Sequence, residues 1–105
     1  MRLLKKQVYY VFLLQPTLAV TGKSLTKREQ KFLKDQDYFQ QCYSQIDSVL
    51  RDFNADNYKY FNLTDIFDNM NDQEDIFIDS YHFGDKGNEI IAENIYHHIK
   101  NIIIQ

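Results

Sequence analysis

The run VYYVFLL at residues 8–14 is the feature that most constrains how this chain can fold. It is β-branched and aromatic, has no polar face, and lies between Lys6 and Pro16. A continuous apolar run of this length is typical of a strand that is covered on both sides, as in a parallel sheet. The run is too short to cross a bilayer, and no convincing signal-peptide cleavage site follows it. We therefore expect a buried strand over about residues 7–14 and no transmembrane segment.

Helical and extended patterns alternate along the rest of the chain. Thr26 and Glu29 have the spacing of a capping box, which predicts a helix start. Apolar residues then recur at helical spacing and predict one continuous helix over about residues 26–51. The aromatic, alternating sequence YKYFNLT predicts a second strand over about 58–63. A stripe of isoleucines predicts a last helix over about 85–103.

The order strand, helix, strand, loop, helix predicts an α/β fold with parallel strands. Two parallel strands alone do not make a stable sheet, because each keeps an unpaired edge. We therefore expect residues 1–105 to be the C-terminal part of a larger single domain, or a subunit that completes its sheet with a partner. That partner would be a second copy of the chain or a complementary polypeptide segment.

Composition narrows the classes of protein to which the chain can belong. Hydrophobic residues make up 44% and aromatics 15%, which is the composition of a globular domain. The formal net charge is -3, so the chain lacks the basic surface that nucleic-acid binding requires. Cys42 is the only cysteine, which excludes an intrachain disulfide and a CxxC redox motif. We expect a cytoplasmic protein, with which a single cysteine is compatible.

The sequence DSYH places Asp79 three residues before His82, after the apolar IFI and ahead of the last helix. A histidine acts as a general base when one ring nitrogen faces the reacting group and the other donates to a fixed acceptor. On a tight turn, the Asp79 carboxylate can reach Nδ1 of His82 and leave Nε2 pointing outward. By spacing alone, Asp79 could instead brace the turn and His82 could be an ordinary surface histidine, since Asp and His often fall at this spacing by chance.

The surrounding sequence, FIDSYHFGDKGNEIIAENI, resembles the last sequence block of the SGNH hydrolases, also called GDSL-type esterases or lipases. In that block an Asp-x-x-His pair precedes a Gly-Asn-like dipeptide and an apolar helix. The matching positions here are Asp79, His82, Gly87, Asn88, Ile91 and Ala92. VYYVFLLQPTL also looks like the strand and loop before the family's penultimate helix, and LTKREQKFL resembles the start of that helix. The resemblance covers most of the chain but only the C-terminal portion of the family.

This resemblance implies a flavodoxin-like, three-layer α/β/α sandwich, of which this chain would provide the last two parallel strands and their helices. Residues 76–84 would form the catalytic-type loop. The implied reaction is ester hydrolysis through a serine acyl-enzyme, in which His82 is the base and Asp79 orients it. The implied substrates are esters such as acylated carbohydrates or lipids, and neither a metal nor an organic cofactor is implied.

The acylation half of such a site is missing from the sequence. The family's nucleophile lies in a Gly-Asp-Ser block, and the chain has no such block. None of its serines has a strand-to-helix nucleophile setting; they are Ser24, Ser44, Ser48 and Ser80. A base without a nucleophile or an oxyanion hole cannot carry out the two-step chemistry. We therefore expect an inactive fragment, one half of a split enzyme, or a remnant.

Three other functions compete with this one. A non-catalytic interaction module would use the open sheet edge to recruit another chain. A nucleotide- or flavin-binding domain would need a Gly-rich phosphate loop after its first strand, and QPTLAVTG is not one. The acidic stretch DIFDNMNDQED at 65–75 lacks the spacing of a calcium loop and is expected to be a solvated loop.

Overall fold

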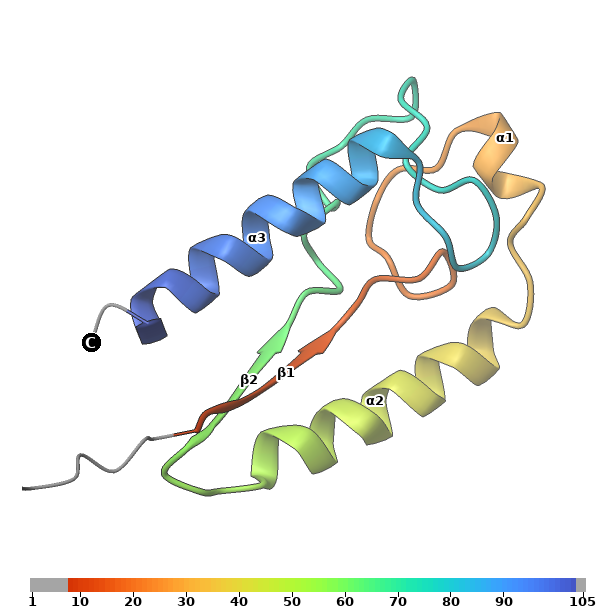
Figure 1. The fold of residues 1–105 in the computed structure, drawn as a ribbon. Helices are drawn as coiled ribbons and strands as arrows, with labels where there is room; N and C mark the ends of the chain where they lie inside the picture. Colours follow the sequence, from red (N-terminus) through yellow and green to blue (C-terminus); the bar gives the residue numbers. More distant parts are fainter. Residues whose placement is uncertain (1–7, 104–105) are drawn as a thin grey trace, which may run out of the picture.

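The computed structural model describes residues 8–103, which form two strands and three helices. In chain order they are β1 (Tyr10–Leu14), α1 (Lys27–Gln30), α2 (Gln36–Asp52), β2 (Tyr58–Asn62) and α3 (Asp85–Ile103) (Figure 1). The strands are parallel and pair from Tyr10 opposite Tyr58 to Leu14 opposite Asn62. This confirms the prediction of an α/β fold with two parallel strands.

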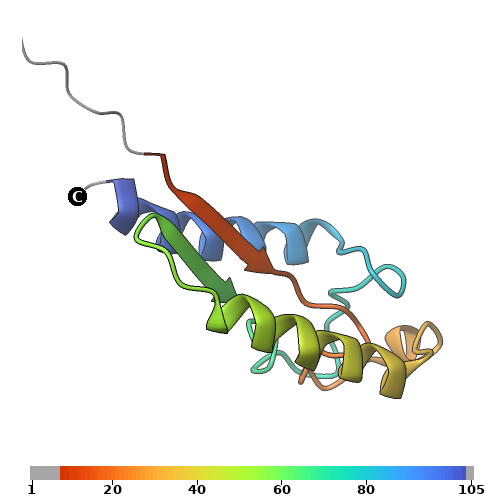
Figure 2. The same ribbon diagram turned by 90° about the horizontal axis from the view of Figure 1, so that it is seen from below.

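The two long helices lie on opposite faces of the sheet (Figures 1 and 2). Successive side chains of β2 alternate between these helices, as the pleat of a strand requires. Tyr60 faces α2, where its hydroxyl donates to Oδ1 of Asp47 at 2.7 Å. Phe61 faces α3, where its ring stacks on His98 with 4.1 Å between centroids. Both faces of the short sheet are therefore in contact with a helix.

The strand and last-helix bounds are close to the predicted ones. β1 begins at Tyr10 rather than near residue 7, which lies outside the described residues. β2 ends at Asn62, although Leu63 still donates its amide to the carbonyl of Leu14 at 2.9 Å. The last helix covers residues 85–103, as predicted.

The prediction of one helix over 26–51 is wrong, because the chain breaks between α1 and α2. Asp35 has φ 52° and ψ 36°, a left-handed conformation that aspartate tolerates better than most residues. Phe32 and Leu33, in the break, pack against the buried core. Tertiary packing of these two residues therefore outweighs the helical periodicity on which the prediction rested.

The hydrophobic core lies beyond the carboxyl ends of the strands, not between the sheet and α2. Leu18, Phe67, Ile76 and Phe77 form one cluster in which no residue is more than 1% exposed. All four belong to connecting segments, whereas α2 contains no buried residue. The loops that follow the strands are consequently the best-packed part of the described chain.

Truncation of Phe67 should therefore cost more stability than truncation on the long helix. Phe67→Ala removes a fully buried ring that contacts Phe77 and Phe83, and should lower the free energy of unfolding by about 3–5 kcal/mol. The control, Val49→Ala on α2, removes a side chain that is 70% exposed and should change it by no more than about 0.5 kcal/mol. Urea unfolding followed by circular dichroism measures both. Equal losses would show that the core does not lie in the loops.

Candidate active site

Residues 76–84 form a short hairpin-like loop beyond the carboxyl ends of the strands. Phe77 and Phe83 face each other in an isolated antiparallel bridge. The amide of Ile78 donates to the carbonyl of His82 at 3.0 Å, and the amide of Gly84 donates to that of Ile76 at 2.9 Å. The loop base is thus fixed by backbone pairing and by phenylalanines that pack on the core.

Asp79 and His82, at the tip of this loop, contact each other directly. Oδ2 of Asp79 lies 2.8 Å from Nδ1 of His82. Oδ1 of Asp79 accepts the backbone amides of Tyr81 and His82, each at 2.7 Å. One carboxylate therefore braces the turn and orients the ring, so the two readings of the sequence describe different oxygens of the same group.

The geometry determines which nitrogen of His82 can act as a base. An ionised carboxylate can only accept hydrogen bonds, so Nδ1 must carry a proton in this contact. In the neutral ring, Nε2 then carries the free lone pair. The side chain of His82 is 72% exposed, which leaves it accessible from outside the loop.

The same contacts keep Asp79 ionised. Hydrogen bonds from the backbone amides of Tyr81 and His82, and then from the His82 side chain, lower the pKa of Asp79 to about 2. Burial opposes these effects only weakly. Asp79 is therefore an acceptor at any pH at which a neutral histidine could act as a base.

Ser80 ties the loop to two other segments. Its carbonyl accepts the amide of Leu18 at 3.2 Å, in the segment that follows β1. Its hydroxyl donates to the carbonyl of Phe32 at 2.7 Å, in the break between α1 and α2. Ser80 is thus a structural residue of the turn.

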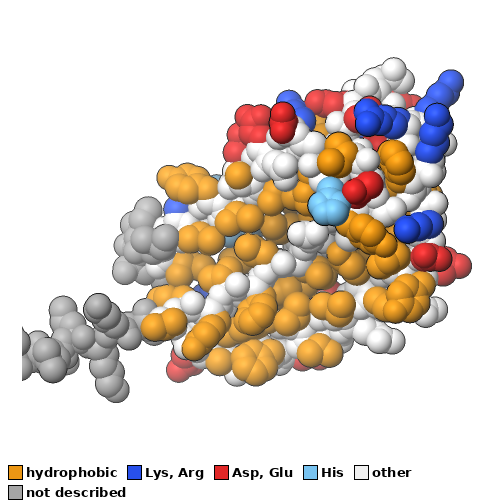
Figure 3. All heavy atoms as spheres, turned by 45° about the vertical axis from the view of Figure 1, so that its right-hand side comes forward, with side chains coloured by type: hydrophobic (Ala, Val, Ile, Leu, Met, Phe, Trp, Pro, Cys, Tyr) orange, Lys and Arg blue, Asp and Glu red, His pale blue; other side chains and the backbone are white. Residues whose placement is uncertain are grey.

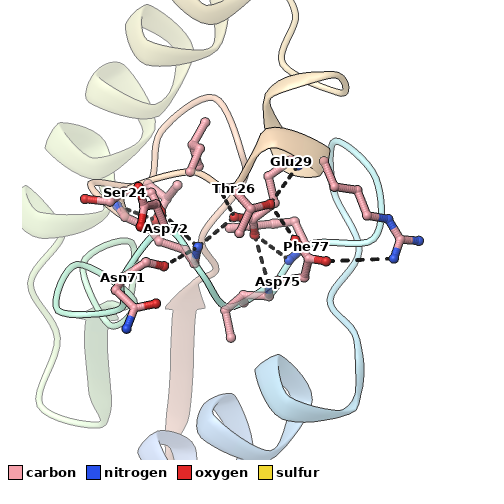
Figure 4. Close-up of polar contacts among 12 residues, drawn as sticks. Ser24, Thr26, Glu29, Asn71, Asp72, Asp75 and Phe77 are labelled. Atoms are coloured by element: carbon pink, nitrogen blue, oxygen red, sulfur yellow. Dashed lines mark hydrogen bonds and ion pairs between the residues drawn. The ribbon is translucent and has the colours of Figure 1, made fainter.

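Glu29 anchors the base of the loop from a fully buried position (Figure 4). Its Oε2 accepts the amides of Ile76 at 3.0 Å and Phe77 at 2.9 Å. Its Oε1 accepts the amide of Thr26 at 3.0 Å and pairs with Nζ of Lys23 at 2.6 Å. Burial acts to raise the pKa of Glu29, but the bonds from Lys23 and the three amides outweigh it and lower the pKa.

The sequence predicted only some of the contacts that Glu29 makes. The capping box correctly predicted that Thr26 and Glu29 hold each other at the start of α1. The contacts of Glu29 with residues 76 and 77 were missed, because nothing in local spacing links positions so far apart. Lys23 was missed too, although its side chain is fully buried against Glu29. The local sequence around a loop lysine does not indicate whether its side chain is buried.

Gly87 allows α3 to start close to this loop. A side chain at Gly87 would place its Cβ 2.8 Å from Cβ of Phe83 and 3.0 Å from Cγ2 of Ile76, nearer than such atoms normally approach. Asn88 next to it donates from Nδ2 to the carbonyl of Phe83 at 3.3 Å. The glycine and asparagine that follow the Asp–His pair thus serve the packing of helix against loop.

Other side chains add no further catalytic group to His82 within the described chain. Ser44 and Ser48 are exposed on α2, Ser24 is exposed before α1, and no serine in residues 8–103 is hydrogen-bonded to His82. In the same residues, no group of three or more His, Cys, Asp or Glu side chains could hold a metal ion. No helix formed by these residues is long and apolar enough to cross a membrane.

Comparison of the chain with protein-family models, curated proteins and solved structures finds no match. Its membership of the SGNH hydrolases therefore stays a prediction.

The ionisation of Asp79 should be visible as a pH dependence of stability. Its pKa is 3.8 when unperturbed and about 2 in the folded chain, so its contribution is complete above pH 3.8 and is lost as the pH falls towards 2. The stability difference between the natural chain and Asp79→Asn should shrink over this window, as measured by urea unfolding. ¹³C NMR of the Asp79 carboxyl carbon follows the same ionisation directly. A titration midpoint at 3.8 would show that the carboxylate makes none of these contacts in solution.

Proposed function

We propose that the chain provides the Asp–His half of a Ser-His-Asp catalytic triad in an ester hydrolase of the SGNH type. His82 is the general base and Asp79 is the residue that orients it. The observation that carries the proposal is the contact of 2.8 Å between Nδ1 and the carboxylate on a ring that is 72% exposed. The resemblance of residues 77–95 to the last block of that family supports the same assignment.

The chemistry that follows is proton transfer at Nε2 of His82. Nε2 accepts the proton of a serine hydroxyl as the serine oxygen attacks the ester carbonyl, and returns that proton to the leaving alcohol. Asp79 stabilises the imidazolium that forms between these two steps. In the second step His82 activates water in the same way, and the acyl group leaves as a carboxylic acid. The substrate class proposed is an ester of a carbohydrate or lipid.

The nucleophile and the oxyanion hole must come from another stretch of polypeptide. Ser80 is not the proposed nucleophile, because its hydroxyl donates to the carbonyl of Phe32 at 2.7 Å. The open edge of β1 is where further parallel strands would extend the sheet towards a complete flavodoxin-like sandwich. The SGNH fold is therefore proposed for the assembly of this chain with that segment.

The apolar surface next to β1 also favours a second function, a module that binds another chain through its sheet edge. Tyr10 and Phe12 on β1 are 56% and 48% exposed, and Val49 and Phe53 on α2 are 70% and 59% exposed. Figure 3 shows hydrophobic side chains gathered in a broad band over this side of the molecule. β1 contains no charged residue, whereas β2 contains Lys59, so β1 has the less protected edge.

The catalytic proposal is tested by hydrolysis of p-nitrophenyl acetate, with the chain alone and with the N-terminal part of an SGNH esterase that contains its Gly-Asp-Ser block. The chain alone should show no hydrolysis that depends on His82. In an active mixture, His82→Ala should reduce the rate by about 10²–10⁴-fold, because the general base is lost. His97→Ala on α3 is the control and should leave the rate unchanged. A mixture that is equally active with His82→Ala would contradict the proposal.

Association through the β1 edge is tested separately by sedimentation velocity. The chain should form dimers or larger species, and Tyr10→Lys should reduce this association because it places a charge in the apolar band. Tyr96→Lys is the matched control, since Tyr96 is 69% exposed on α3, on the opposite face of the sheet. A natural chain that is monomeric at all concentrations would argue against use of the edge by a second copy.

A further inference from the structure

We infer that Glu29 is a positioning residue for the Asp79–His82 pair, an inference that rests on the proposed function. Glu29 lies far from this pair in the sequence and does not touch it. Its carboxylate holds the amides of Ile76 and Phe77, which form the base of the loop that carries the pair.

Glu29 holds the base of the loop on the side of residues 76 and 77. The amides of Ile76 and Phe77 both point to Oε2 of this residue, at 3.0 and 2.9 Å. Across the loop, the carbonyl of Ile76 accepts the amide of Gly84, and the amide of Ile78 donates to the carbonyl of His82. These backbone hydrogen bonds link segment 76–78 directly to residues 82–84, so the position of the segment determines the position of His82.

Glu29 is itself held too firmly to follow the loop. Lys23 pairs with Oε1 and donates from Nζ to the carbonyls of Ser24 and Asn71, at 2.9 and 3.1 Å. The side chains of Lys23 and Glu29 are both 0% exposed. A buried ion pair with each polar atom satisfied is costly to rearrange, because any displacement leaves a charge without a partner.

Only a carboxylate can make this set of contacts. The four groups around Glu29 are all donors: Nζ of Lys23 and the amides of Thr26, Ile76 and Phe77. In Glu29→Gln, one carboxylate oxygen becomes an amide nitrogen, which would face donors on whichever side it lies. The variant therefore loses either the contacts with Lys23 and Thr26 or those with Ile76 and Phe77, at nearly constant side-chain volume, and in both cases the support of the loop by an ion-paired carboxylate is lost.

The test is the tautomer of His82 in the neutral ring, read by long-range ¹H–¹⁵N NMR of the whole chain. The natural chain should have the proton on Nδ1, and Glu29→Gln should lower the ratio of the Nδ1–H to the Nε2–H form by about fivefold or more, the equivalent of one hydrogen bond. Leu63→Ala is the comparison for stability, since it leaves a cavity at a residue that is 2% exposed but outside the core cluster that includes Phe77. Arg28→Gln, at an exposed position of α1, is the control for a surface change.

The outcomes separate this inference from the proposed function. Loss of the tautomer preference in Glu29→Gln, with the preference retained in Leu63→Ala and Arg28→Gln, supports positioning by Glu29. An unchanged preference in folded Glu29→Gln, or an equal loss in Leu63→Ala, overturns it. A natural chain without any preference for Nδ1–H would instead contradict the Asp79–His82 pair on which the proposed function depends.

Hydrogen exchange of the natural chain provides a second test if Glu29→Gln does not fold. The amides of Ile76 and Phe77, bound to Glu29, and those of Tyr81 and His82, bound to Asp79, should become accessible in one opening event with the same denaturant dependence. Separate opening of the two groups, with residues 81 and 82 exposed while 76 and 77 stay protected, overturns the inference.

Discussion

The carboxylate of Glu29 is the interaction on which the rest of this structure depends. It joins the start of α1, the buried Lys23 and the base of the 76–84 loop at a single point. Lys23 and α1 are close in the sequence, whereas Ile76 at the base of the loop comes 47 positions after Glu29. Because every neighbour of the carboxylate is a donor, its charge is balanced only when all of them are in place. The site loop therefore takes its position from a polar contact within an otherwise apolar core.

Asp79 repeats the same principle at the surface. One of its oxygens closes a turn of backbone amides and the other fixes the imidazole of His82. Two carboxylates in series thus define where Nε2 points, the first by holding the loop and the second by holding the ring. This ordering fixes the imidazole before any substrate or partner is present, as the proposed role of His82 requires.

Local patterns predicted the elements well and the long-range contacts poorly. Both strands, the capping box at Thr26 and the last helix could be predicted, because each depends on neighbouring residues. The break at Asp35 could not, because it serves the packing of Phe32 on segments that arrive later in the chain. The stretch 65–75 was expected to be solvated because most of its residues are acidic or polar. Phe67 within it is nevertheless fully buried. The Asp79–His82 contact followed from spacing, whereas the buried support beneath it did not.

In most domains the helices and strands are packed more tightly than the loops, and in this chain the order is reversed. Here the connecting segments enclose the tightest packing, and α2 rests on the sheet without burying any residue completely. Thermal motion should therefore loosen the α2 layer first, while the segment that carries the imidazole keeps its shape. A chain that paired with β1, as proposed above, would then meet an imidazole already held by Asp79.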